Sequence, residues 1–136
     1  IRQLQVLDRV NRYVIFMQDD VDNGVVQPTE NFTVVTLKKS PYPYWEQVLL
    51  PAAAKAYKVD LLHCTSNTAP LNITIPTLIT LHDIIYLEKI NFTKGTLYQI
   101  AGNFYRRWNV PRAVKKAAHL ITVSDYERAR IRDHFT

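Results

Sequence analysis

The chain has 136 residues, of which 47% are apolar and 21% are charged, and its formal net charge is +5 at pH 7. This length and composition fit one globular domain with a sizeable core and exclude a low-complexity or disordered chain. No stretch approaches the roughly 18 consecutive apolar residues that a membrane-spanning helix needs.

The first half of the chain predicts two helices and two strands. Residues 1–7 have the pattern of a helix, and residues 13–17 and 32–37 are short β-rich runs. Residues 44–58 form a helical segment rich in Leu and Ala. Because the ring of Pro51 removes one backbone donor, we expect a kink or a division of this helix there.

Two further strands are predicted in the middle of the chain, at residues 61–64 and 77–81. The segment between them is too short for a full helical crossover, so their parallel pairing rests on weaker grounds than that of the other strands. Residues 84–87 continue the apolar character after the second strand, and they predict a turn folded over its end.

The last third of the chain predicts a long helix, a strand and a capped helix. Residues 96–118 have helical character, and Pro111 leaves open whether they form one helix or two. Residues 119–123 form an apolar strand. Ser124 and Glu127 then give the S-x-x-E capping box of a final helix.

Strands that alternate with helices, without a domain break, predict one α/β domain. Its sheet should be doubly wound and mostly parallel, with helices on both faces. In such a sheet, ligands bind outside the carboxyl ends of the strands. Three predicted strands end there on polar residues, namely Thr65 and Ser66, His82 and Asp83, and Ser124. We therefore expect these side chains to line one crevice.

His82 and Asp83 carry the sharpest chemical signal among these residues. An imidazole at a strand end can exchange hydrogen bonds with a sugar hydroxyl or a leaving-group oxygen at neutral pH. The alternative is structural: Asp83 caps the next turn, and His82 bonds only to backbone. Thr65 and Ser66 either bind a polyol or satisfy the backbone of an ordinary loop. Ser124 is first a helix cap, and its helix start offers N–H groups to an anion.

Metal and self-contained nucleotide sites are not predicted. The four His residues lack paired-ligand spacing for zinc, and His63, inside a strand, is interpreted as a core residue. Cys64 is interpreted as a buried, inert thiol. No G-x-G-x-x-G or Walker motif occurs, and Gly is found only at positions 24, 95 and 102. A nucleotide would therefore be held elsewhere.

Positive charge is concentrated in the last third of the chain. The residues expected to meet an anionic membrane surface are Arg106, Arg107, Arg112, Lys115 and Lys116. The alternative is a solvated helix face. A nucleic-acid partner is disfavoured, because the aromatic residues have core-like spacing and form no stacking platform.

The single cysteine excludes an internal disulfide framework and favours a reducing compartment. No secretory signal is visible, and the sequons at Asn31, Asn72 and Asn91 are interpreted as chance occurrences. We expect a cytoplasmic protein that is peripheral to the inner face of the membrane if its basic residues bind lipid.

Four segments, in this order and spacing, resemble one protein family. They are YWEQVLLP at residues 44–51, VDLLHC at 59–64, IPTLITLHDIIY at 75–86 and AAHLITVSDYE at 117–127. They are similar to the amino-terminal domain of family-4 glycosyltransferases. The resemblance implies a GT-B architecture, in which two Rossmann-like domains face each other across a cleft and the amino-terminal one receives the acceptor.

The resemblance also implies an activity. Family members transfer a hexose from a nucleotide sugar with retention of anomeric configuration and without an obligatory metal, and their carboxyl-terminal domain holds most of the nucleotide sugar. The family's His at the position of His82 reaches into the cleft near the donor sugar. For Asp83 the resemblance implies only a loop-shaping or polar-contact role.

Two parts of the family pattern are missing, which are the first strand with its glycine-containing loop and the donor-binding domain. We therefore expect residues 1–136 to be a single acceptor-side domain that is inactive alone, because stabilising a departing diphosphate needs groups this chain lacks. Loss of the first strand leaves sheet surface uncovered and favours a partner.

The function predicted from the sequence is that of the acceptor-side domain of a retaining glycosyltransferase. The transferred group would be a hexose of the mannose or glucose type, and the acceptor a glycan or glycolipid of a polysaccharide pathway. Two alternatives remain open. One is a sugar-nucleotide epimerase of the same architecture, and the other is a non-catalytic module that binds glycan or phosphate.

Overall fold

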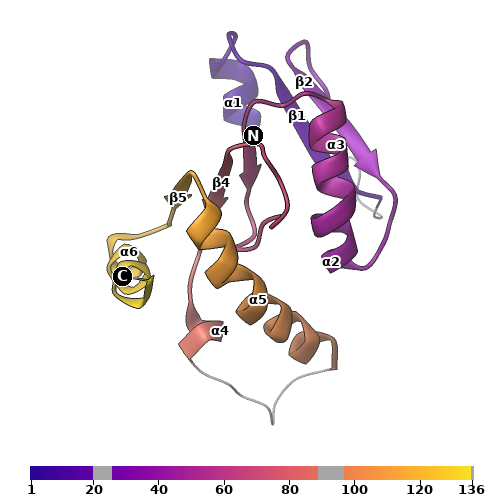
Figure 1. Cartoon of the computed structure of the whole chain (residues 1–136). Coiled ribbons are helices and arrows are strands. Elements are labelled where there is room, and N and C mark those ends of the chain that lie inside the picture. The colour runs from indigo at the N-terminus through magenta and orange to yellow at the C-terminus, as the bar shows by residue number, and fades with distance from the viewer. Residues whose placement is uncertain (20–25, 89–96, 136) are drawn as a thin grey trace. The chain divides into compact units, whose positions relative to one another are not determined.

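The computed structural model describes residues 1–19, 26–88 and 97–135. Gly24, Gly95, the sequon at Asn91 and the predicted helix start at residue 96 lie outside these ranges. The chain divides into two compact units, Ile1–Val59 and Asp60–Thr136, and each has its own parallel sheet (Figure 1). The predicted α/β class with parallel strands is confirmed.

The first unit contains helix α1 (Arg2–Leu7) and a two-stranded parallel sheet of β1 (Tyr13–Gln18) and β2 (Phe32–Leu37). The register places Tyr13 opposite Phe32, and their rings stack with centroids 4.3 Å apart. Phe32 is almost fully buried, so this aromatic pair anchors one end of the sheet.

Pro51 does not divide the predicted helix, and a π-helical turn comes directly before it within a continuous helical segment. The segment runs through α2 (Tyr42–Tyr44), the π-helix η1 (Trp45–Leu49) and α3 (Leu50–Ala56). The N–H of Leu50 donates to the carbonyl of Trp45, five residues earlier. The wider turn falls directly before the residue that has no N–H to donate, so the helix continues without dividing.

The second unit is built on strands β3 (Leu62–Cys64), β4 (Thr77–Thr80) and β5 (His119–Ile121), all parallel and in the order β3-β4-β5. The pairing of β3 with β4 is present although no helix connects them. Strand β3 ends at its predicted residue, whereas β4 ends one residue and β5 two residues before the predicted end.

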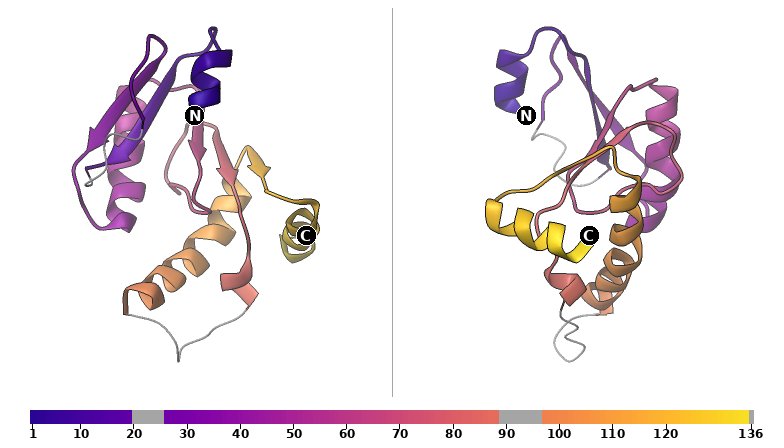
Figure 2. Two further views of the ribbon diagram at one scale, coloured as in Figure 1. Left: turned by 180° about the vertical axis from the view of Figure 1, so that it is seen from behind. Right: turned by 60° about the vertical axis from the view of Figure 1, so that its left-hand side comes forward.

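Three helices accompany this sheet: α4 (Ile85–Glu88), α5 (Leu97–Lys116) and α6 (Asp125–Phe135). The predicted turn after β4 is the short helix α4. Helix α5 runs unbroken through Pro111, which decides the open question in favour of one helix. Figure 2 shows α5 returning from the α4 end of the unit to the start of β5, so α5 is the crossover between two parallel strands.

The core of the second unit lies where the end of β4 meets the helices. Leu81, Ile84, Val110 and Ile131 are buried together there, and Phe135 packs against them. This cluster ties α5 and α6 to the segment that follows β4, and that segment carries His82 and Asp83. No described helix has the length and apolar character required to cross a membrane.

Candidate functional site

The carboxyl ends of β3, β4 and β5 meet at one edge of the sheet, as their parallel register requires. Cys64 pairs with Ile79, and Thr80 pairs with Ile121. The residues that follow each strand therefore emerge at this edge, which is where an open α/β sheet binds ligands.

His82 is exposed at this edge and is held by two hydrogen bonds. Its backbone N–H donates to Oδ1 of Asn67 at 2.7 Å, and its ring Nε2 lies 2.9 Å from the carbonyl oxygen of Thr65. A carbonyl oxygen can only accept, so Nε2 carries the hydrogen. In the neutral ring, Nδ1 is then an acceptor, and no described residue bonds to it.

The loop after β3 supplies both partners of His82. Thr65 and Ser66 are exposed, and Thr65 meets His82 through its backbone carbonyl. The carbonyl of Ser66 accepts from the N–H of Thr68 at 2.7 Å, so Ser66 closes the loop and does not contact His82. The amide of Asn67 was visible in the sequence as a possible polyol ligand, but its bond to the His82 N–H was not predicted; a polar residue able to take a left-handed backbone at a strand end was the available signal.

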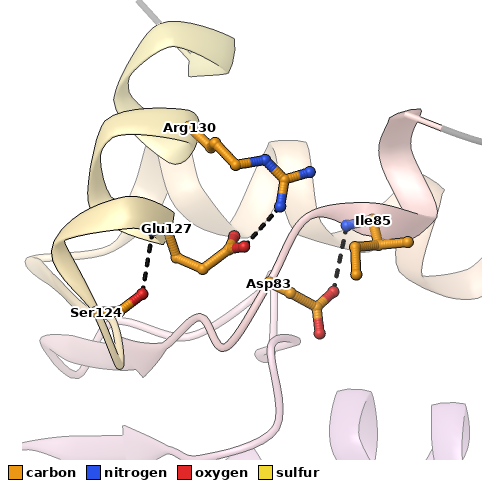
Figure 3. Close-up of polar contacts among 5 residues, drawn as sticks. All are labelled: Asp83, Ile85, Ser124, Glu127 and Arg130. Carbon is orange, nitrogen blue, oxygen red and sulfur yellow. Dashed lines mark hydrogen bonds and ion pairs between the residues drawn. The ribbon is translucent and has the colours of Figure 1, made fainter.

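Asp83 shapes the start of α4. Its Oδ1 accepts a hydrogen bond from the N–H of Ile85 at 3.2 Å (Figure 3). Burial, followed by the negative charge of Asp83, raises the pKa of the Tyr86 hydroxyl well above its usual value. The two bonds of the structural alternative, a cap by Asp83 and a backbone bond by His82, are therefore both present. They coexist with the unpaired Nδ1 of His82.

Ser124 caps α6, as predicted: its Oγ accepts from the N–H of Glu127 at 3.2 Å. The Glu127 carboxylate turns to Arg130 and pairs with it at 2.5 Å, with only 12% and 21% of the two side chains exposed. In Figure 3 this pair extends from α6 toward the segment that carries Asp83. The sequence reasoning missed the pair, although its i, i+3 spacing on a helix was visible.

The predicted residues form two groups and not one continuous lining. His82 and Thr65 are in contact, whereas Ser124 lines an open hollow of about 620 Å³ between β5 and α6. Residues 120–125 of the chain form one wall of this hollow, and Arg128, Ile131 and Arg132 form the other. Neither His82 nor Thr65 is among the residues that line it.

His63 is not a core residue, so that prediction was wrong. It is exposed, and its Nε2 lies 2.8 Å from Oγ1 of Thr80 on the neighbouring strand. The alternation of side chains along β3 places His63 on the face opposite to the buried Leu62 and Cys64. Cys64 is buried and in no disulfide. In the described ranges, no three His, Cys, Asp or Glu side chains gather as a metal site would require.

The model of one protein family, described as Glycosyltransferase Family 4, matches residues 12–136. The chain belongs to glycosyltransferase family 4. It represents the amino-terminal domain of the GT-B type, which the four sequence segments had indicated. Searches of curated proteins and of solved structures found no match.

In this family-4 domain, the five basic residues expected to meet a membrane all lie on α5, and three of them donate to carbonyl oxygens. Arg107 donates to Tyr86 and Arg112 to Trp108, each at 2.5 Å, and Nζ of Lys116 donates to Leu71 at 2.8 Å. The Arg112 guanidinium also lies over the Trp108 ring, 5.4 Å from its centroid. These cations thus order the helix surface and the neighbouring loops as well as carrying charge.

Proposed function

We propose that the chain is the acceptor-side domain of a retaining hexosyltransferase, which moves a mannose- or glucose-type sugar from a nucleotide sugar to a glycan or glycolipid. The observation that carries the proposal is His82, exposed at the carboxyl edge of the sheet with its ring held in place in a family-4 domain. A ring fixed in this way presents one acceptor atom, Nδ1, to a sugar hydroxyl.

The chemistry that this chain contributes is binding and orientation. Nδ1 of His82 accepts a hydrogen bond from a hydroxyl of the sugar, and the Thr65 and Ser66 side chains are available to further hydroxyls. Negative charge develops on the departing diphosphate, and cations and N–H groups of a second, donor-binding domain stabilise it. The chain alone is then inactive, and the reaction has no obligatory metal.

The test is turnover by an enzyme that joins this chain to a donor-binding domain. His82→Ala should lower the rate of sugar transfer sharply while the circular dichroism spectrum stays unchanged. His63→Ala is the matched control, because His63 is an exposed histidine of the same sheet that lies outside the proposed site. Equal rates for His82→Ala and the unmodified enzyme would remove His82 from the site.

The products separate this proposal from its alternatives. A labelled nucleotide sugar incubated with acceptor should yield a glycoside with the donor's anomeric configuration, read by NMR. Recovery of an isomerised nucleotide sugar without transfer indicates an epimerase. Glycan binding without any turnover indicates a non-catalytic module.

We also propose that α5 docks the protein on an anionic membrane at the cytoplasmic face, where lipid-linked acceptors reside. Phe104 and Trp108 are 56% and 46% exposed, and their spacing places them on the same helix face as Arg112 and Lys115. Aromatic rings beside cations suit the boundary between head groups and acyl chains.

Vesicle flotation tests this docking. The chain should float with vesicles that contain phosphatidylglycerol, fail to float with phosphatidylcholine alone, and lose binding as salt rises. Arg112→Gln should weaken flotation more than Arg128→Gln, which removes an equal charge from the exposed surface of α6. Equal binding to both kinds of vesicle ends the idea.

A further inference from the structure

Asn67 connects the loop after β3 to the segment that carries His82 by two bonds. Its backbone N–H donates to the carbonyl of Thr80 at 3.2 Å, and its side-chain Oδ1 accepts from the backbone N–H of His82 at 2.7 Å. These two contacts lie on either side of Leu81, a fully buried residue. One residue therefore clamps the end of β4 to the loop.

The backbone of Asn67 explains why the clamp is an asparagine. Its φ is 62°, in the left-handed region, where glycine is the freest residue and Asn and Asp are the most tolerant of the others. Glycine would fit this backbone but would bring no acceptor for the His82 N–H. Asparagine satisfies both requirements.

The far side of the same loop is hydrogen-bonded to α5, so the loop that carries Asn67 is held at both of its ends. The buried Asn109 side chain accepts from the N–H of Ala69 at 3.1 Å and donates to its carbonyl at 2.9 Å. Lys116 adds a bond to Leu71. The carbonyl of Thr65, which faces the ring of His82, thus belongs to a loop that is held at several points.

We infer that Asn67 is a positioning residue of the site: together with the carbonyl of Thr65, it holds the imidazole of His82 in its Nε2–H form and leaves Nδ1 as the atom offered to a ligand. The geometry around the ring stands independently of any reaction. Only the identification of that ligand as a sugar hydroxyl rests on the proposed function.

The first test reads the ring itself, by long-range ¹⁵N–¹H correlation spectra of the chain labelled in its histidines, at about pH 8.5, where free imidazole is neutral. His82→Gln assigns the signals. The unmodified chain should show His82 as the Nε2–H tautomer, with its two nitrogen shifts well separated. In Asn67→Gly the two shifts should move toward a common average, because the bond from Oδ1 to the His82 N–H is lost and only the backbone bond to Thr80 remains at this point of the loop.

Two controls keep this test decisive. Lys58→Gly places glycine at the other positive φ of a described non-glycine residue, 52°, in the first unit, and should leave the His82 signals unchanged. Asn67→Asp keeps an acceptor and a tolerated backbone, and should preserve the tautomer. An Nδ1–H tautomer in the unmodified chain, or separated shifts that persist in Asn67→Gly, overturns the inference.

The second test uses turnover by the enzyme that joins this chain to a donor-binding domain. Asn67→Gly should lower kcat with little change in KM for the nucleotide sugar, and it should have no added effect in the His82→Ala background. If His82→Ala leaves turnover unchanged while the NMR result holds, the proposed function fails and the positioning of the ring stands. If Asn67→Gly and His82→Ala lower turnover additively, Asn67 acts independently of His82 and the inference fails.

Discussion

At the scale of single residues, the side chain of Asn109 joins α5 to the loop after β3 through hydrogen bonds to a peptide group. The amide of Asn109 makes both bonds that a neighbouring strand would offer to Ala69, and Asn109 and Ala69 are 0% and 1% exposed. Both residues are closed off from solvent, so breaking these bonds destabilises the fold.

Asn109→Ala should lower the free energy of unfolding by about 2 kcal/mol, because it removes two buried hydrogen bonds to Ala69 at about 1 kcal/mol each. Chemical denaturation monitored by fluorescence measures this loss. Asn103→Ala makes the same substitution at an exposed site of α5 and should have little effect. Equal losses for the two variants would contradict the role given to Asn109.

Asp8 organises the turn after α1. Its carboxylate accepts hydrogen bonds from the side chain of Asn11, the hydroxyl of Tyr13, and the N–H groups of Asn11 and Val10. These bonds, that of the Asn11 side chain foremost, hold the pKa of Asp8 well below its ordinary value of 3.8.

A carboxyl group whose pKa is lower in the folded chain than in the unfolded chain stabilises the fold at pH values above its unfolded-state pKa. This stabilisation is lost as the pH falls through the folded-state pKa. Asp8→Asn should therefore lower the unfolding temperature at pH 7, and the difference from the unmodified chain should shrink as pH falls below about 4. Thermal melts between pH 7 and pH 2 measure this trend. A difference that stays constant with pH would contradict it.

At the scale of elements, local chemistry explains which segments fold into helices and strands. Ser124 caps α6 because its hydroxyl meets the N–H of Glu127, and both residues are visible in the sequence. Ser124→Ala should lower the free energy of unfolding by about 1 kcal/mol. Ser124→Asp should lower it much less, because the Asp carboxylate can also cap the helix. Denaturant titrations of the two variants decide this, and equal losses would show that capping is not the cause.

Helix α5 tolerates an interior proline at a cost. Pro111 has no N–H for the carbonyl of Arg107, four residues earlier, and an interior proline is about 3 kcal/mol less favourable than alanine. Pro111→Ala should therefore raise the unfolding temperature. Pro43→Ala, in the first turn of α2 where no bond is lost, should change it much less. A fall in stability on Pro111→Ala would indicate that packing of the proline ring stabilises the fold by more than the missing hydrogen bond costs.

Caps and strand ends were predictable because they depend on residues a few positions apart. The end of β3 and the cap by Ser124 follow from such patterns, and the ends of β4 and β5 lie within two residues of the predicted ones. Asn109 and Ala69 are 40 residues apart, and Asn67 reaches His82 across 15. Neither pair leaves a periodic signal, so the contacts that hold the candidate site emerge only once the chain is folded. The same limit explains His63, whose exposure depends on which sheet face is covered.

At the scale of the whole molecule, two units with separate sheets share one chain, and the single cysteine lies in the second. Cys64 is 8% exposed on β3, beside Ile79 of β4. A thiol in this place reacts only when the sheet opens.

Thiol labelling of the native chain should be slower than labelling in denaturant by a factor on the order of 100 or more, because only opened molecules react. It should accelerate in Asn109→Ala and stay unchanged in Asp8→Asn, whose site lies in the first unit. The absorbance of the released thiol reagent measures both rates. Labelling of the native chain at the denatured rate would show that β3 is open in solution.

The hydrogen bonds between Asn109 and Ala69 hold the loop after β3 through its peptide groups alone, and so does the bond from Asn67 to Thr80. Substitution at the exposed tips, Thr65 and Ser66, leaves these anchors intact. Under the proposed function, substitutions at Thr65 and Ser66 therefore change the acceptor preference while the imidazole of His82 keeps its position and the rest of the fold is unaltered.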